Sequence, residues 1–190
     1  MLYASDTQVN AIVPYSLASG PSAAATNLTV ESGPFSASYA VQGVWKAWPA
    51  VFTQGEQAAA INQDGSINSQ SNPAPVGSVI SLYATGLGAL NGPLPDNAMT
   101  PLSAPRPGLV EGFGAYIGAP AGNAGAAGME VWYAGPAPGM PPGVYQLNVR
   151  IPAGATLGEA PITLQMDLSD CVGFAPCASP HGPYVWTKGQ

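Results

Sequence analysis

The stretch YQLNVRIP, residues 145–152, decides how this chain folds. Its apolar residues Leu147, Val149 and Ile151 occupy alternate positions, and polar residues stand between them. This period of two predicts a β-strand with one face buried and the other in contact with solvent. Pro152 marks the end of the strand, because proline has no N–H to donate to a neighbouring strand.

A second version of the same strand lies near the beginning of the chain. TQVNAIVP, residues 7–14, places Val9, Ala11 and Val13 on one face and also ends in proline, so it predicts another half-buried strand. The flanking segments correspond as well: YAS at 3–5 with YAG at 133–135, NLTVES at 27–32 with PITLQM at 161–166, and FSASYAVQ at 35–42 with GPYVWTK at 182–188. Self-similarity of this kind indicates tandem modules.

Only the second version is preceded by further predicted strands. These are QAAAINQ at 57–63, GSVISLYATGLG at 77–88, FGAYIG at 113–118 and MEVWYAG at 129–135. We therefore expect an all-β chain without a long helix. Residues 1–50 are expected to form the rear half of one β-sandwich module, and residues 51–190 a complete one.

Composition and charge exclude two classes of partner. The net charge is −6, and the four cations are scattered along the chain at Lys46, Arg106, Arg150 and Lys188. Nucleic-acid binding needs clustered cations to neutralise phosphates, so nucleic acid is not expected. No apolar run approaches the roughly 18 residues of a transmembrane helix, so no membrane span is expected.

Three stretches carry a resemblance to a known family. They are LYASDTQVNAIVPY at 2–15, INQDGSINSQSNPAPVGSVISLYATGLG at 61–88 and YAGPAPGMPPGVYQLNVRIP at 133–152. In order and spacing they closely resemble the Solibacter-type uncharacterised C-terminal domain of exported acidobacterial proteins. SVISLYATGLG is also similar to the opening strand of the immunoglobulin-like modules of transcription-factor type, the IPT/TIG modules.

The resemblance implies a fold, a location and a set of partners. It implies an extracellular or cell-surface immunoglobulin-like β-sandwich that is one module of a larger exported bacterial protein, with the other modules of that protein as partners. A secretory signal would then belong to a longer precursor. The family supplies no catalytic residues to transfer to this sequence.

The two cysteines, Cys171 and Cys177, bracket the sequence CVGFAPC. Their spacing is too wide for a redox CxxC motif, and no second cysteine pair accompanies them as in a zinc site. A local disulfide is the favoured prediction, and two buried thiols are the alternative. This cysteine loop departs from the plain final strand of the family.

Oxygen-bearing side chains alternate in NQDGSIN, residues 62–68. The set Asn62, Asp64, Ser66 and Asn68 resembles the front of a calcium loop but lacks the closing bidentate glutamate. The pair Asp64-Gly65 also predicts a tight hairpin turn. A calcium site therefore stands as one interpretation, and a structural turn without a cofactor as the other.

Five aromatic residues are candidates for binding a sugar by stacking. They are Trp45, Trp48, Trp132, Tyr133 and Tyr184. The competing interpretation places them in the core or at the interface between the two modules, because large rings bury much apolar area. Two or more exposed and coplanar rings would favour a glycan ligand.

Catalytic residues are sparse in this sequence. His181 is the only histidine, and it lies in the turn-like segment SPHGPY without a G-x-S-x-G motif elsewhere. Glu111, Glu130 and Glu159 could supply a glycosidase pair only if the fold placed two of them in one cleft.

Three classes of function remain open at this point. The favoured one is a noncatalytic structural or adhesive module. A carbohydrate-binding module is the alternative. The third class is an enzyme with a metal site that the sequence does not reveal. Because a half-module leaves strand edges open, we also expect residues 1–50 to dock on the complete module or to self-associate.

Overall fold

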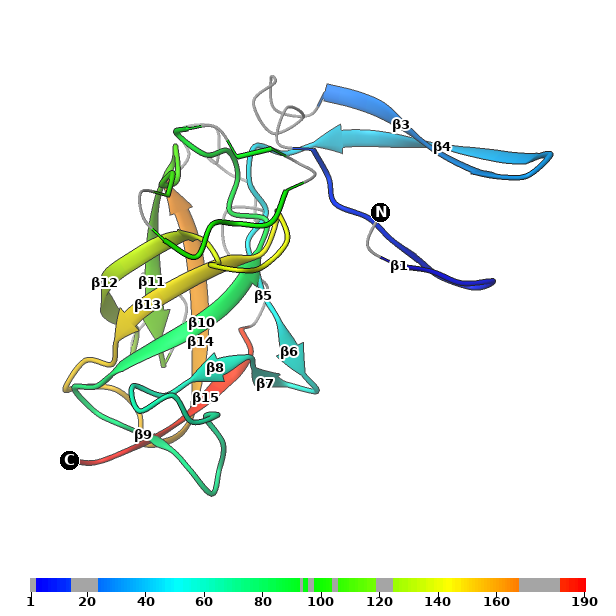
Figure 1. The fold of residues 1–190 in the computed structure, drawn as a ribbon. Helices are drawn as coiled ribbons and strands as arrows, with labels where there is room; N and C mark the ends of the chain where they lie inside the picture. Colours follow the sequence, from blue (N-terminus) through cyan, green and yellow to red (C-terminus); the bar gives the residue numbers. More distant parts are fainter. Residues whose placement is uncertain are drawn as a thin grey trace.

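The computed structural model describes residues 3–14, 24–92, 94–95, 98–103, 106–118, 125–167 and 182–190. Within these ranges there are fifteen strands and no helix, so the predicted all-β class is confirmed (Figure 1). The same ranges contain no helix of the length and hydropathy needed to cross a membrane.

Eleven strands form one large mixed sheet, which makes up the body of the molecule. In hydrogen-bonded order it runs through β5 (Ala50–Val51), β10 (Val79–Thr85), β13 (Tyr145–Arg150), β12 (Ala127–Pro136), β11 (Gly112–Ile117), β14 (Gly158–Asp167), β15 (Tyr184–Lys188), β7 (Gln57–Ala58) and β6 (Thr53–Gln54). Two further short strands join it, β8 (Ala60–Ile61) on β10 and β9 (Ala74–Pro75) on β15. The pairs of β15 with β7 and β9 are parallel, and the others are antiparallel.

The short strands β7 and β8 bring this sheet close to a closed ring. β7 pairs with β15 towards one end of the strand order, whereas β8, only a few residues later, pairs with β10 towards the other end. The predicted strand 57–63 is therefore split, because its two parts serve different partners. On the opposite side, β12 pairs through its first part with β11 and through its second part with β13.

The interior is filled by every second residue of the long strands. β10 and β13 alternate between buried and half-buried residues along their whole length. The predicted inward face is confirmed, because Leu147, Val149 and Ile151 have no exposed surface. Ile80 and Leu82 of β10 and Ile162 and Leu164 of β14 are equally buried. Each such side chain contributes about 1.5–3 kcal/mol to folding.

Two hairpins precede this body and stand away from it in Figure 1. The first pairs β1 (Tyr3–Ala4) with β2 (Val9–Asn10), and the second pairs β3 (Ala24–Ser32) with β4 (Phe35–Val44). Within the described ranges, neither is hydrogen-bonded as a strand to the large sheet.

The predicted half-buried strand at 7–14 is wrong. Only Val9–Asn10 forms a strand, and the side chains of Val9 and Val13 are exposed to solvent. The alternation of the sequence is the same as at 145–152, but among the described residues no second sheet covers the N-terminal copy. Alternation with a period of two decides which face of a strand is apolar. That face becomes buried only when another layer of the protein packs on it.

Candidate functional site

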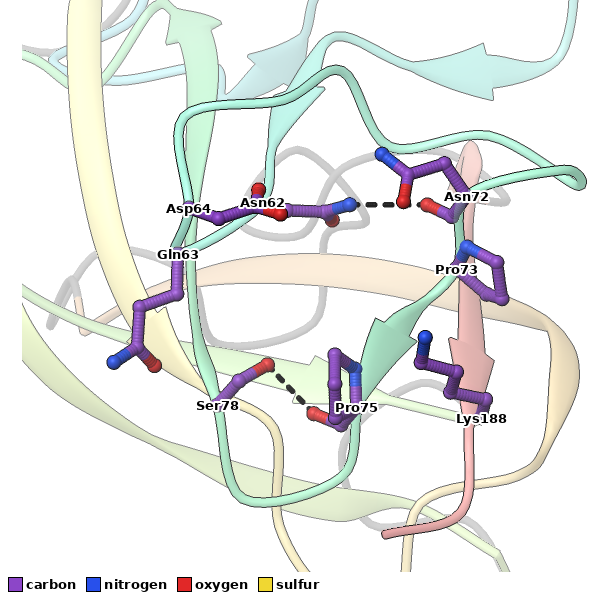
Figure 2. Close-up of a pocket in the computed structure, with 8 residues that line it drawn as sticks. All are labelled: Asn62, Gln63, Asp64, Asn72, Pro73, Pro75, Ser78 and Lys188. Atoms are coloured by element: carbon purple, nitrogen blue, oxygen red, sulfur yellow. Dashed lines mark hydrogen bonds between the residues drawn. The ribbon is translucent and has the colours of Figure 1, made fainter.

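A pocket lined mostly by polar residue types lies between the loop that follows β8 and the C-terminal strand β15, as Figure 2 shows. Its volume is about 420 Å³, and its lining residues are Asn62, Gln63, Asp64, Asn72, Pro73, Pro75, Ser78 and Lys188. Two of the four predicted calcium ligands, Asn62 and Asp64, are among them.

Asp64 and Gly65 lie in the tight turn that the sequence predicts. The N–H of Gly65 donates to the carbonyl of Asn62 at 2.9 Å, and Gly65 has a φ of 85°. The Ser66 hydroxyl and the Ser66 N–H both donate to Asp64 Oδ1. These two hydrogen bonds, the hydroxyl's first, lower the pKa of the Asp64 carboxyl, because they stabilise its ionised form.

Asn68 is buried and joins this loop to β15. Its Nδ2 donates to the carbonyl of Trp186 at 2.8 Å, and its Oδ1 accepts from the N–H of Trp186 at 2.7 Å. The same Nδ2 donates to Asn62 Oδ1 at 2.9 Å, and Asn62 Nδ2 donates to the carbonyl of Asn72 at 3.0 Å. The two asparagines thus act as a cross-link between loop and strand.

The calcium hypothesis for Asn62, Asp64, Ser66 and Asn68 stays a prediction. The amide oxygens of Asn62 and Asn68 already accept hydrogen bonds from protein N–H groups. In the part of the chain that the structure describes, no group of three or more His, Cys, Asp and Glu residues is placed to hold a metal ion. The arrangement observed here accounts for these residues as a structural loop.

The five aromatic candidates lie in three places, so the structure does not bring them together as one stacking surface. Trp45 and Trp48 lie between the second hairpin and the large sheet, Trp132 and Tyr133 lie on β12, and Tyr184 lies on β15. The ring of Tyr184 meets that of Trp186 edge-on, with centroids 5.7 Å apart.

An apolar groove of about 600 Å³ lies where the N-terminal part meets the large sheet. Its lining includes Ile12, Val13, Pro14 and Val41 from the N-terminal part, Trp45, Ala47, Trp48 and Phe52 from the following segment, and Pro142, Val144 and Tyr145 from the start of β13 and the turn before it. The indoles of Trp45 and Trp48 have centroids 6.3 Å apart and planes tilted by 53°. Because they are not coplanar, they offer no single flat surface to a sugar ring.

Trp132 is presented on a β-bulge of β12. The pairing of β12 with β13 skips Trp132 between Val131 and Tyr133, and the Trp132 side chain is 57% exposed. The Arg150 guanidinium lies 4.6 Å from the centroid of its ring, and Arg150 Nε lies 3.1 Å from a carboxylate oxygen of Glu130. Bulges redirect side chains, and this one turns an indole towards solvent with a cation over its face.

Amide and hydroxyl groups lie beside this indole on the same sheet. Asn148 stands opposite Tyr133 on one side and Ser81 on the other. Asn148 Oδ1 accepts from Ser81 Oγ at 2.9 Å and from Gln146 Nε2 at 2.8 Å, which fixes the orientation of its amide. Sequence reasoning found Trp132 and Tyr133 but not these polar neighbours, because register decides which residues share a face.

The second hairpin has one apolar face and one polar face. Leu28 stands opposite Tyr39 and Val30 opposite Ala37, so these four side chains share a face, together with Phe35 at the turn. We call these five residues the apolar hairpin face; all five are exposed.

On the reverse side of the same hairpin, Thr29 stands opposite Ser38 and Glu31 opposite Ser36. The hydroxyl oxygens of Thr29 and Ser38 are 3.2 Å apart. The sequence predicted both strands, but the exposure of both faces became visible only in the structure.

Several candidates fall outside the described residues or on separate strands. Cys171, Cys177 and His181 lie outside the described ranges, so the disulfide stays a prediction. Of the three glutamates, Glu130 on β12 faces Arg150, and Glu159 on β14 stands opposite Trp186. The structure shows no two of the three in contact.

Comparison of the chain with protein-family models, with curated proteins and with solved structures finds no match.

Proposed function

We propose that this chain is a noncatalytic structural and adhesive module of a larger exported bacterial protein, located outside the cell. In this proposal residues 51–190 form an immunoglobulin-like β-sandwich. Residues 1–50 form a partial module that attaches the chain to neighbouring modules. The function is mechanical: it holds protein parts together through β-sheet contacts.

One observation carries this proposal, namely the second hairpin. Its strands β3 and β4 have nine and ten residues, and within the described ranges they are hydrogen-bonded as strands only to each other. A two-stranded hairpin alone is marginally stable in water, and its outer edges offer unpaired N–H and C=O groups to another strand. A hairpin of this length beside a well-packed body is suited to receive a neighbouring sheet.

Hydrogen exchange on two forms of the protein tests this role. The amides of β3 and β4 are compared between the single chain at high dilution and a tandem of two full chains joined end to end. We expect their exchange in the second unit of the tandem to slow by at least about tenfold, because a neighbouring module covers the hairpin. The amides of β13 serve as a control, since they are protected in both forms. Equal exchange of β3 and β4 in both forms would contradict the proposal.

A carbohydrate-binding role is a second candidate, favoured by Trp132. An exposed indole beside the oriented amides of Asn148 and Gln146 combines a stacking surface with hydrogen-bonding groups, as polysaccharide sites require. A glycan and polymer binding screen on the full chain, with and without calcium, tests this role. Trp132→Ala should abolish any binding, whereas Trp48→Ala, a change of the same size in the groove, should leave it unchanged.

A further inference from the structure

The outward face of three neighbouring strands gathers polar side chains beside the exposed indole of Trp132. In hydrogen-bonded order the strands are β10, β13 and β12. Ser81, Asn148 and Tyr133 stand opposite one another in a row across these strands, and Gln146 lies two positions from Asn148 on β13. The fold thus joins a stacking surface to hydrogen-bonding groups that are far apart in the sequence.

We infer that this face binds an uncharged polysaccharide in an extended conformation, of the β-1,4-linked type. The inference rests on the second candidate function, carbohydrate binding, and names the class of glycan. The contact residues, which we call the polar sheet face, are Ser81, Trp132, Gln146 and Asn148.

Arg150 occupies one side of the indole of Trp132 and leaves the other side for a ligand. Its guanidinium lies 4.6 Å from the ring centroid, and its Nη1 donates to the carbonyl of Gly77 at 3.3 Å. Its Nε lies 3.1 Å from a carboxylate oxygen of Glu130. Trp132 nevertheless stays 57% exposed. A ring that is already held in one orientation loses little conformational freedom when a sugar stacks on it.

The amides beside Trp132 have unused hydrogen-bonding capacity. Asn148 Oδ1 accepts from Ser81 Oγ at 2.9 Å and from Gln146 Nε2 at 2.8 Å, and these two bonds fill its two lone pairs. Among the described residues, Asn148 Nδ2 and Gln146 Oε1 make no side-chain hydrogen bond. Asn148 Nδ2 can therefore donate to a ligand, and Gln146 Oε1 can accept. A sugar hydroxyl both donates and accepts, so neighbouring hydroxyls match this pair.

The charges around the polar sheet face favour an uncharged ligand. Arg150 is paired with Glu130, so their formal charges cancel. Arg106, the other cation nearby, lies 5.6 Å from the ring centroid of Tyr133, and its Nη1 donates to the carbonyl of Leu102 at 2.9 Å. The chain as a whole carries −6, which repels a polyanion. An acidic polysaccharide is therefore disfavoured, whereas an uncharged one approaches without penalty.

The shape of the polar sheet face favours an extended chain. Trp132 lies on β12 and Ser81 on β10, with β13 between them. Two spacings between neighbouring strands span about 10 Å, which is about the length of two sugars in an extended polysaccharide. A β-1,4-linked glucan has this form. Its rings present flat C–H faces to an indole and equatorial hydroxyls to the amides beside it.

Affinity electrophoresis of the full chain tests the inference, because retardation in a gel that contains dissolved polymer detects weak binding. The two polymers are hydroxyethyl cellulose, which is uncharged, and carboxymethyl cellulose, which has the same backbone and carries carboxylates. We expect retardation by hydroxyethyl cellulose, and at least about fivefold weaker binding to carboxymethyl cellulose.

Two matched pairs of variants locate the binding site. Trp132→Ala should weaken binding to hydroxyethyl cellulose by at least about tenfold, whereas Trp48→Ala should change it less than about twofold. Asn148→Asp replaces a donor by an acceptor and should weaken binding by at least about fivefold. Asn10→Asp adds the same charge in the exposed first hairpin and should leave binding unchanged. The unfolding midpoint of each variant shows that the chain is still folded.

The outcomes assign each failure to one proposal. Equal or stronger binding to carboxymethyl cellulose that still depends on Trp132 overturns the uncharged class and leaves carbohydrate binding in place. Binding that is insensitive to Trp132→Ala, or equally sensitive to Asn148→Asp and Asn10→Asp, overturns the polar sheet face as the site. Retardation by neither polymer overturns this inference and the carbohydrate-binding candidate together. The structural role is tested separately, by hydrogen exchange of β3 and β4.

Discussion

The strands β3 and β14 carry the same alternating pattern and differ in what covers them. Ile162 and Leu164 of β14 are buried within the nearly closed sheet, whereas Leu28 and Val30 of β3 face solvent. The local sequence sets the strand in both cases. The comparison shows that burial of a strand depends on the sheet that packs on it, so the same pattern lies in the core at β14 and on the surface at β3.

The largest expected effect comes from truncating equivalent residues of the two copies. Ile162→Ala should destabilise the body by about 3 kcal/mol, because it removes buried methylene groups and leaves a cavity. Leu28→Ala should change the free energy of unfolding by less than about 0.5 kcal/mol, since its side chain is already in water. Denaturant unfolding at a protein concentration low enough to exclude association measures both. Equal losses would show that the hairpin is part of the folding core.

The next effect concerns the side-chain hydrogen bonds by which Asn68 holds β15; no described residue of the large sheet makes such bonds to the second hairpin. Asn68→Ala should cost about 2–3 kcal/mol, because it leaves the N–H and C=O of the half-buried Trp186 without their partner. Ser71→Ala, on the exposed side of the same loop, is the matched control and should be nearly neutral. Thermal unfolding of both variants checks the difference, and a neutral Asn68→Ala would refute the cross-link.

Substitution of two glycines with positive φ, one in the body and one in the hairpin, compares how tightly the two regions constrain the backbone. A Cβ on Gly86 would lie 1.9 Å from the carbonyl oxygen of Trp48, so Gly86→Ala must displace the segment beside the groove. It should cost about 2 kcal/mol or more, from this clash together with a φ of 73°. Gly33, in the hairpin turn, has a φ of 58° and open space around it. Gly33→Ala should therefore cost only about 1 kcal/mol, from backbone strain alone. Unfolding midpoints of the two variants compare them, and a larger loss for Gly33→Ala would contradict this ranking.

Local pattern was enough to predict the long strands of the body and the turn at Asp64-Gly65, but not the short strands β5, β6 and β9. The predicted runs at 77–88, 113–118 and 129–135 contain β10 and most of β11 and β12. Alternation and turn residues act over a few positions, and the sequence displays them directly.

What the sequence could not predict depends on pairing between distant segments. Asn68 bonds to Trp186 across 118 residues, and no local feature of NQDGSIN distinguishes that role from a metal ligand. The cation over Trp132 arises because register and a bulge bring Arg150 beside it. In the same way, only the assembled sheet reveals that the aromatic candidates are dispersed and that no strand in the described part of the chain lies over the first copy.

The smallest expected effect is the pH dependence of the loop that anchors β15. The pKa of the Asp64 carboxyl is lowered in the folded state, first by the Ser66 hydroxyl and then by the Ser66 N–H. A lowered folded pKa means that ionised Asp64 stabilises the fold above the pKa of the unfolded chain, and that this contribution is lost as the pH falls through the folded value. The carboxyl is fully exposed, so solvent screens the effect and it stays small. Asp64→Asn keeps an oxygen acceptor for Ser66 but removes the charge. We expect the difference in unfolding midpoint between the parent and Asp64→Asn to be measurable near about pH 6 and to be smaller near about pH 3, which lies below the ordinary value of 3.8 at which the unfolded chain takes up the proton. A difference that is the same at both pH values would assign the role of Asp64 to the shape of the turn and not to its charge.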